Sequence, residues 1–122
     1  MSSKALFVLL ALLLSVLPGE GADPVAEDQA RLLYQQGLQA WHNRQYEEAA
    51  RLCRRAMALD PDQAEAPNLL GAVLVQDRDF QGARKLYARS FKLKPNFNSA
   101  FNLAEMDFCE KKWRQMLQPL LL

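Results

Sequence analysis

Apolar and small residues recur with helical spacing along most of the chain after residue 28. Ala30, Leu33 and Gly37, for example, are three or four positions apart, which is the spacing of residues on one face of an α-helix. Polar segments and prolines interrupt this pattern at regular intervals. The expected helices cover residues 28–42, 46–59, 64–76, 80–93, 98–109 and 113–118, with turns between them. The sequence therefore predicts an all-α fold.

The pattern returns after 34 residues. The stretch 45–63, QYEEAARLCRRAMALDPDQ, corresponds to the stretch 79–97, DFQGARKLYARSFKLKPNF. Tyr46, Ala49, Cys53, Ala56, Leu59 and Pro61 are answered by Phe80, Ala83, Tyr87, Ser90, Leu93 and Pro95, and Gly37 is answered by Gly71 in the preceding helix. A fixed period with a small residue early, an aromatic residue after a polar turn and a closing proline is typical of a helix-turn-helix repeat.

This combination of residues resembles the tetratricopeptide repeat (TPR), well over residues 30–97 and more loosely elsewhere. The resemblance implies TPR-type helix-turn-helix repeats, about two and a half of them, that form a short right-handed solenoid. We expect a TPR domain over residues 29–122, with repeats at about 30–63 and 64–97 and a partial repeat at 98–122. The motif identifies an architecture but specifies no binding partner.

The third repeat departs from the pattern. Glu105 stands where Gly71 stands in repeat two, and Trp113 comes one residue earlier than the period requires. We expect a shortening by one residue, either in a turn at residues 110–112 or ahead of Ala104. Apolar residues then end the chain without a further helix to cover them, which favours a homo-oligomer through the C-terminal end. These residues are Trp113, Met116, Leu117, Leu120, Leu121 and Leu122.

The first 21 residues are typical of a secretory signal peptide. Lys4 precedes an apolar run of 13 residues, Ala5 to Leu17, and small residues around Gly21 and Ala22 suit cleavage. The run is shorter than the roughly 20 residues that a membrane-spanning helix needs, although an uncleaved anchor remains the alternative. We expect a secreted or periplasmic protein, a linker at residues 22–28 and no membrane insertion of the mature chain.

Composition and charge argue against several classes of function. The formal net charge is +1, from 15 basic and 14 acidic residues, which gives no reason to expect nucleic-acid binding. The single histidine, His42, has no cysteine or carboxylate at metal-ligand spacing. We therefore predict no enzyme, no metal and no cofactor. Cys53 and Cys109 should lie two stacking steps apart, too far for a disulfide, so both are expected as free thiols.

The resemblance also implies that the first helix of each repeat lines a concave groove. The groove residues would be Tyr34, Leu38 and Trp41, then Asn68, Ala72 and Val75, then Asn102, Met106 and Cys109. Tyr34 and Trp41 would serve as apolar anchors, and the two asparagines would hold a peptide backbone. Alternatively, both aromatic residues pack against neighbouring helices. Tyr34 and Leu38 stand where a clamp for C-terminal carboxylates would need lysine and asparagine, which disfavours such a clamp.

The sequence as a whole predicts an exported module that binds a protein or peptide in its concave groove, as an adaptor or assembly scaffold. The alternative from another class is a structural building block that associates with itself and takes no foreign ligand.

Overall fold

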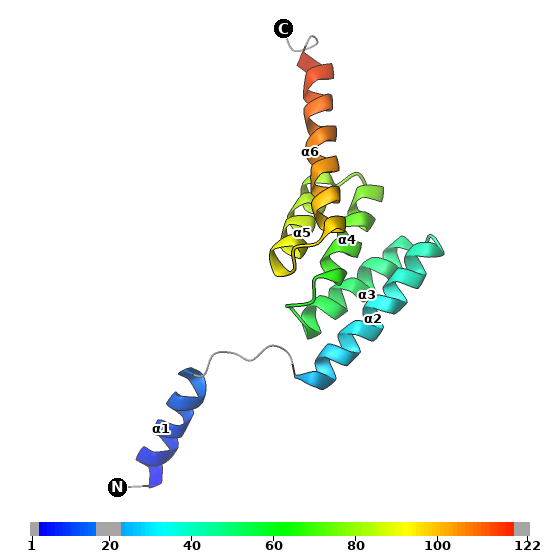
Figure 1. The fold of residues 1–122 in the computed structure, drawn as a ribbon. Helices are drawn as coiled ribbons and strands as arrows, with labels where there is room; N and C mark the ends of the chain where they lie inside the picture. Colours follow the sequence, from blue (N-terminus) through cyan, green and yellow to red (C-terminus); the bar gives the residue numbers. More distant parts are fainter. Residues whose placement is uncertain (1–2, 17–22, 119–122) are drawn as a thin grey trace.

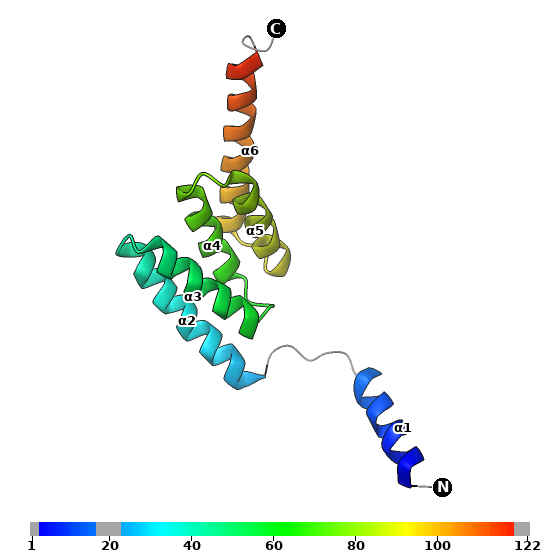
Figure 2. The same ribbon diagram turned by 180° about the vertical axis from the view of Figure 1, so that it is seen from behind.

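The protein is seen here in a computed structural model that describes residues 3–16 and 23–118. These residues form six α-helices and no strand. In chain order the helices are α1 (Ser3–Val16), α2 (Pro24–His42), α3 (Tyr46–Leu59), α4 (Glu65–Gln76), α5 (Phe80–Leu93) and α6 (Phe97–Leu117). Figures 1 and 2 show that α2 to α6 pack together, while α1 stands apart from them.

Two helical hairpins form the body of the molecule. In the first, α2 packs against α3, and in the second, α4 packs against α5. The hairpins stack because α4 also contacts both α3 and α2. Each first helix thus packs on its own second helix and on the preceding hairpin, which is an all-α helical repeat architecture.

The turns within the two hairpins are copies of each other. Arg44 and Arg78 both take left-handed backbone conformations, with φ of 59° and 61°. Each arginine lies in the predicted polar turn, so the sequence-based turns at 43–45 and 77–79 are confirmed. Few residues other than glycine adopt this conformation readily. Its recurrence at the same repeat position shows that the period extends to the backbone dihedral angles.

Helix α2 begins four residues earlier than the sequence pattern indicated. Oδ1 of Asp23 accepts a hydrogen bond of 2.8 Å from the amide of Ala26, and Pro24 occupies the first turn. An aspartate cap followed by proline is a favourable helix start, because proline has no amide hydrogen to leave unpaired there. The interpretation of residues 22–28 as a linker is therefore wrong for residues 24–28.

Helix α6 is continuous through the place where a turn was expected. The turn at Glu110, Lys111 and Lys112 and the separate helix starting at Trp113 are both wrong, since α6 runs without a break from Phe97 to Leu117. Glutamate and lysine are good helix formers. Arg114 donates a hydrogen bond of 3.0 Å to Glu110 one turn earlier, which further supports a continuous helix. The end of α6 consequently projects beyond the two hairpins (Figure 1).

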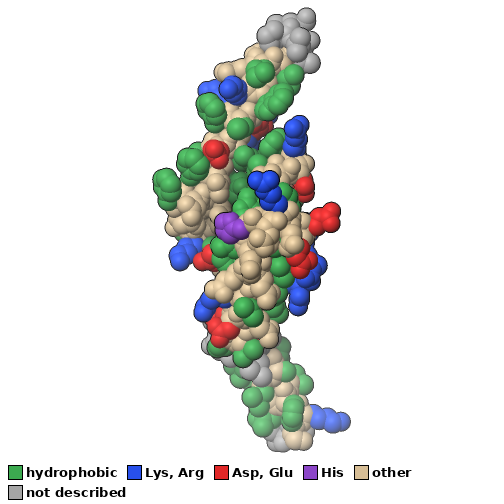
Figure 3. Space-filling view, turned by 90° about the vertical axis from the view of Figure 1, so that its right-hand side faces the viewer, with side chains coloured by type: hydrophobic (Ala, Val, Ile, Leu, Met, Phe, Trp, Pro, Cys, Tyr) green, Lys and Arg blue, Asp and Glu red, His purple; other side chains and the backbone are tan. Residues whose placement is uncertain are grey.

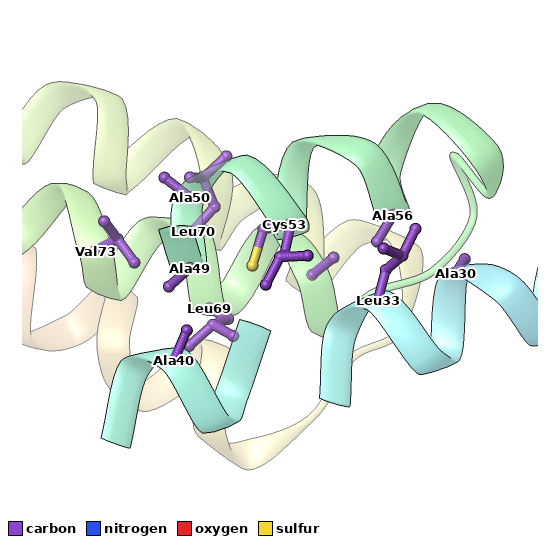
Figure 4. Packing of buried hydrophobic residues seen from close by; sticks show 12 residues of the cluster. Ala30, Leu33, Ala40, Ala49, Ala50, Cys53, Ala56, Leu69, Leu70 and Val73 are labelled. Atoms are coloured by element: carbon purple, nitrogen blue, oxygen red, sulfur yellow. The ribbon is translucent and has the colours of Figure 1, made fainter. Parts of the chain in front are cut away.

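The buried residues form two clusters of unequal size. The larger cluster joins α2, α3 and α4 and includes Ala30, Leu33, Ala40, Ala49, Ala50, Cys53, Ala56, Leu69, Leu70 and Val73 (Figure 4). The smaller consists of Ala83, Tyr87 and Met106 with half-buried neighbours from α4 and α6. Ala66 and Leu70 of α4 are buried, whereas their counterparts Ala100 and Ala104 in α6 are exposed. At these two positions α6 therefore lacks the cover that α4 has.

Helix α1 carries apolar side chains on all sides. Leu6, Phe7 and Leu13, for instance, are all exposed to solvent. No helix in the described part of the chain is both long and apolar enough to span a membrane. The expected cleavage site around Gly21 and Ala22 lies outside the described residues.

Candidate peptide-binding groove

The predicted groove residues of repeat one form an aromatic ridge on α2. Tyr34, Leu38 and Trp41 are all half-buried and pack against the larger core cluster. The Trp41 ring lies 5.2 Å from the Tyr46 ring, centroid to centroid, at an interplanar angle of 59°, a favourable tilted arrangement. Burial, with a smaller contribution from the charge of Glu65, raises the pKa of Tyr34. One edge of each side chain thus packs against the core, and the other edge remains accessible to a ligand.

The two predicted asparagines lie side by side across the repeat boundary. Nδ2 of Asn102 donates a hydrogen bond of 3.1 Å to Oδ1 of Asn68, and both side chains are half-buried. This contact does not use the Asn68 amide hydrogens or the Asn102 oxygen. A primary amide donates and accepts, so the pair presents a donor next to an acceptor, as a strand does to an extended peptide.

The remaining predicted residues differ in exposure. Val75 is half-buried against the smaller core cluster, and Met106 is itself a buried member of that cluster. Ala72 is half-buried, and Cys109 is exposed. The structure thus brings Asn68 and Asn102 together, whereas Met106 serves the packing of α6 on α5.

A cleft that the sequence reasoning missed lies between α5 and α6. Its volume is about 470 Å³, and its walls combine two exposed aromatic side chains with a charged pair. The lining residues are Phe80, Gln81, Arg84, Lys85, Met106, Cys109, Glu110 and Trp113. The spacing of seven between Met106 and Trp113 could have indicated a shared helix face, but the expected turn separated them.

Ion pairs hold α6 against α5 beside this cleft. The guanidinium of Arg84 contacts Asp107 at 2.9 Å and also pairs with Glu110. The hydrogen bond from Arg84 is the main reason that the pKa of Glu110 lies below its ordinary value, and Arg114 adds to the effect. Because all of these groups are partly exposed to water, the pairs orient the helix more than they stabilise it.

A second hollow is lined in part by Tyr34 and by residues near the start of α2. It encloses about 410 Å³ between the start of α2 and the two interhelical connections. Its walls carry four carboxylates and two cations, namely Glu27, Asp60, Asp62 and Glu65 with Arg31 and Lys94. The open end of the aromatic ridge is therefore polar and mainly acidic.

The two cysteines are free, as the sequence predicted. Cys53 is buried in the larger core, and burial raises the pKa of its thiol to about 12. Such a thiol is unreactive near neutral pH, because the thiolate is the reactive form. Cys109 is exposed at the edge of the cleft. In the part of the chain that the structure describes, no group of histidine, cysteine and acidic side chains could hold a metal ion.

Comparison with known proteins identifies the repeat. A family model described as tetratricopeptide repeat matches residues 40–105, which is more than half of the chain. The chain belongs to the tetratricopeptide repeat family. The matched region starts near the end of α2 and ends within α6, so it includes α3, α4 and α5 and the hydrogen-bonded pair Asn68 and Asn102. A comparison with curated proteins returned no significant match. TPR domains are in general modules for protein interaction, and a role of that general kind follows for this chain.

Proposed function

We propose that this TPR protein binds a peptide segment of another protein along the first helices of its repeats and acts as an adaptor or assembly scaffold. Two observations support the proposal: the half-buried aromatic ridge on α2 and the hydrogen-bonded asparagine pair of α4 and α6. Anchored aromatic side chains lose little conformational entropy on binding.

The two parts of this surface have different tasks. The open edges of Tyr34 and Trp41 bury an apolar side chain of the ligand, and Asn68 and Asn102 pair with its backbone amide and carbonyl groups. The aromatic contact contributes most of the affinity, since such anchors dominate interfaces. The amide pair contributes orientation, because backbone groups are the same in every peptide.

A peptide-display screen tests the groove directly. Ligands selected with the wild-type chain should lose about tenfold or more in affinity on Trp41→Ala and a smaller amount on Asn68→Ala. Gln36→Ala is a matched control, because this exposed residue of α2 is outside the groove face. Ligands that bind all three variants equally well would contradict the groove proposal, and circular dichroism would show whether each variant remains helical.

We further propose that the protein is exported after removal of α1. The apolar run with Lys4 ahead of it supports export. Cleavage before Ala22 or Asp23 would keep Asp23, and with it the hydrogen bond that caps α2. Intact-mass measurement of secreted material should give a chain that begins at one of these two residues. Secreted protein that still carries residues 1–17 would contradict cleavage and favour an anchor.

Self-association is the second candidate function. Trp113, Met116 and Leu117 are all exposed on the projecting part of α6, and Leu120, Leu121 and Leu122 lie outside the described residues. Apolar side chains gathered at one end of a small protein often mark a contact surface. The two candidates are compatible, because the exposed end of α6 is separate from the aromatic ridge on α2.

A further inference from the structure

The hollow that Tyr34 lines carries an excess of acidic side chains, and we call it the acidic hollow. It encloses about 410 Å³, and the charged residues in its walls are Glu27, Asp60, Asp62 and Glu65 with Arg31 and Lys94. Four carboxylates and two cations give these walls a formal charge of −2. On the face drawn in Figure 3, by contrast, acidic and basic side chains are interspersed, in keeping with the net charge of +1 for the whole chain.

The four carboxylates of the acidic hollow have no cation paired with them. Within residues 3–16 and 23–118 the ion pairs involve other acidic residues, namely Asp28, Glu48, Asp107 and Glu110. Nη1 of Arg31 lies 3.5 Å from Oδ1 of Asp28, which is outside the hollow, and Lys94 is exposed to water. The negative charge of the hollow is therefore not neutralised by ion pairs within the fold.

The helix ends around the hollow do not reverse this sign. Glu27 and Glu65 stand in the first turns of α2 and α4, and the N-terminal end of a helix carries a partial positive charge. Asp60 and Lys94 cap the C-terminal ends of α3 and α5, which carry a partial negative charge of similar size. Because two ends of each kind border the hollow, their fields largely cancel, and the carboxylates decide the sign.

The walls of the hollow also contain apolar surface and an unpaired acceptor. Leu93 and Tyr34 are half-buried and line the hollow, so the aliphatic stem of a lysine or arginine would contact apolar groups there. The face of an aromatic ring such as that of Tyr34 also attracts cations. Oε1 of Gln63, another lining residue, is buried and has no hydrogen-bond partner within the described residues. A buried acceptor without a donor is unfavourable, and an N–H group of a ligand would supply one.

Tyr34 connects the acidic hollow with the proposed peptide site. This residue belongs to the aromatic ridge of α2, and it also lines the hollow. Burial and, after it, the charge of Glu65 raise the pKa of Tyr34, in agreement with a carboxylate close to the phenol group. A peptide residue that contacts Tyr34 is therefore also next to the acidic hollow.

We propose that the acidic hollow binds a lysine or arginine side chain of the same peptide whose apolar side chain packs on the aromatic ridge. The cation lies among the carboxylates, and its stem contacts Tyr34 and Leu93. The partner segment is accordingly basic, with a cationic residue close in sequence to its apolar anchor. This inference rests on the proposed function of the groove and adds the charge of the ligand to it.

A peptide-display library with equal contents of basic and acidic residues tests the charge of the ligand. Peptides selected on the wild-type chain should contain about threefold more basic than acidic residues, because opposite charges attract at close range. The double variant Asp62→Asn/Glu65→Gln should select peptides without this excess. The matched control is Glu47→Gln/Asp77→Asn, which changes the net charge equally at two exposed carboxylates outside the hollow.

Synthetic versions of one selected peptide measure the contact itself. Replacement of its lysine or arginine by glutamine should weaken binding to the wild-type chain about tenfold. The same replacement should weaken binding to the double variant less than about twofold, because the contact is already lost there. Isothermal titration calorimetry gives these affinities, and circular dichroism shows whether each variant remains helical.

Several results would overturn the inference. One is a set of selected peptides without an excess of basic residues. Another is a lysine whose replacement costs equal affinity on the wild-type chain and the double variant, since its cation would then bind elsewhere. In both cases a loss of affinity on Trp41→Ala would leave the groove proposal intact.

The opposite result would separate the two proposals in the other direction. Ligands that are indifferent to Trp41→Ala but depend on Asp62 and Glu65 would contradict the groove and support the acidic hollow as a site for a cation. A wild-type chain that selects no peptide at all would overturn both proposals.

Discussion

Repeats one and two have the same helical hairpin, but the side chain that faces the glycine of the first helix differs between them. In repeat one Gly37 lies over Cys53, and a Cβ atom there would meet the sulfur at 3.4 Å, an ordinary contact. In repeat two Gly71 lies over Tyr87, and a Cβ atom would meet the ring at 2.6 Å. The glycines at this repeat position therefore have different physical explanations. In repeat two the Tyr87 ring leaves no space for a side chain, so glycine is required. In repeat one a small side chain would fit, so glycine is not required.

Alanine substitution of the two glycines should have opposite effects. Gly71→Ala should destabilise the protein by about 1–3 kcal/mol, since the Tyr87 ring must move within a packed core. Gly37→Ala should stabilise it by up to about 0.5–1 kcal/mol, since alanine is the better helix former. Urea unfolding of each single variant measures both changes.

A second substitution identifies the cause of the clash. In a Tyr87→Cys background, repeat two has the central residue of repeat one, and Gly71→Ala should cost much less than in the wild-type protein. An equal cost in both backgrounds would show that the ring is not what excludes the Cβ atom.

A buried hydroxyl group is a second difference between the two repeats. Oγ of Ser90 donates a hydrogen bond of 2.7 Å to the carbonyl of Ala64, whereas the corresponding residue in repeat one is the buried Ala56. Ser90→Ala should cost about 1 kcal/mol, the usual net contribution of a hydrogen bond. Thermal unfolding measures the change. If the variant is as stable as wild type, alanine is equivalent to serine at this position, as in repeat one.

The turns should show no difference between the repeats. Arg44→Gly and Arg78→Gly should each stabilise the protein by about 0.5 kcal/mol. Glycine removes the cost of the left-handed conformation, and part of that gain is lost to the greater freedom of the unfolded chain. Because φ is 59° and 61° at the two positions, equal shifts in Tm are expected. Unequal shifts would mean that the arginine side chains make different contributions.

Alkaline pH should affect repeat one before repeat two, with no effect near neutrality. Burial raises the pKa of Cys53 from 9.0 to about 12, and burial with the nearby charge of Glu105 raises that of Tyr87 from 10.0 to about 12. The folded state keeps these protons when the unfolded state releases them. The corresponding stability is therefore present below the unfolded pKa values and is lost as the pH rises towards 12.

Substitutions separate the two titrations. Cys53→Ala should flatten the pH dependence of the unfolding free energy from about pH 9 upward, and Tyr87→Phe only from about pH 10 upward. Urea unfolding at pH 8, 9.5 and 10.5 would check this order. Parallel curves for wild type and Cys53→Ala would contradict the burial of the thiol.

The repeated part of the fold could be predicted from sequence because its signals are local and occur twice. The bounds of α3 and α5 and the turns at Arg44 and Arg78 followed from the period alone. The start of α2 was missed because the cap at Asp23 precedes the first repeat position. The continuity of α6 was missed because strict periodicity was extended into residues 110–112, whose own helix propensity is high.

The candidate site was predictable to the extent that it follows the helix register. The row of Asn68 and Asn102 was expected, and their hydrogen bond follows from the stacking of α6 next to α4 at that point. The burial of Met106 could not be predicted, because it depends on how α6 packs against Ala83 and Tyr87 of α5. The cleft beside Arg84 and Trp113 likewise depends on the direction in which α6 leaves the hairpins.

The unsupported end of α6 also gives the molecule a gradient of local stability. Residues 111–117 are all exposed, so in the free monomer only the helix's own hydrogen bonds hold this segment of about 10 Å. A helical segment so short is marginal in water. Its amides should exchange with solvent through frequent local opening, while those of α3 and α4 exchange only when the core opens. Trypsin should accordingly cut first after Lys111, Lys112 or Arg114, and any contact that covers this segment would slow the cut.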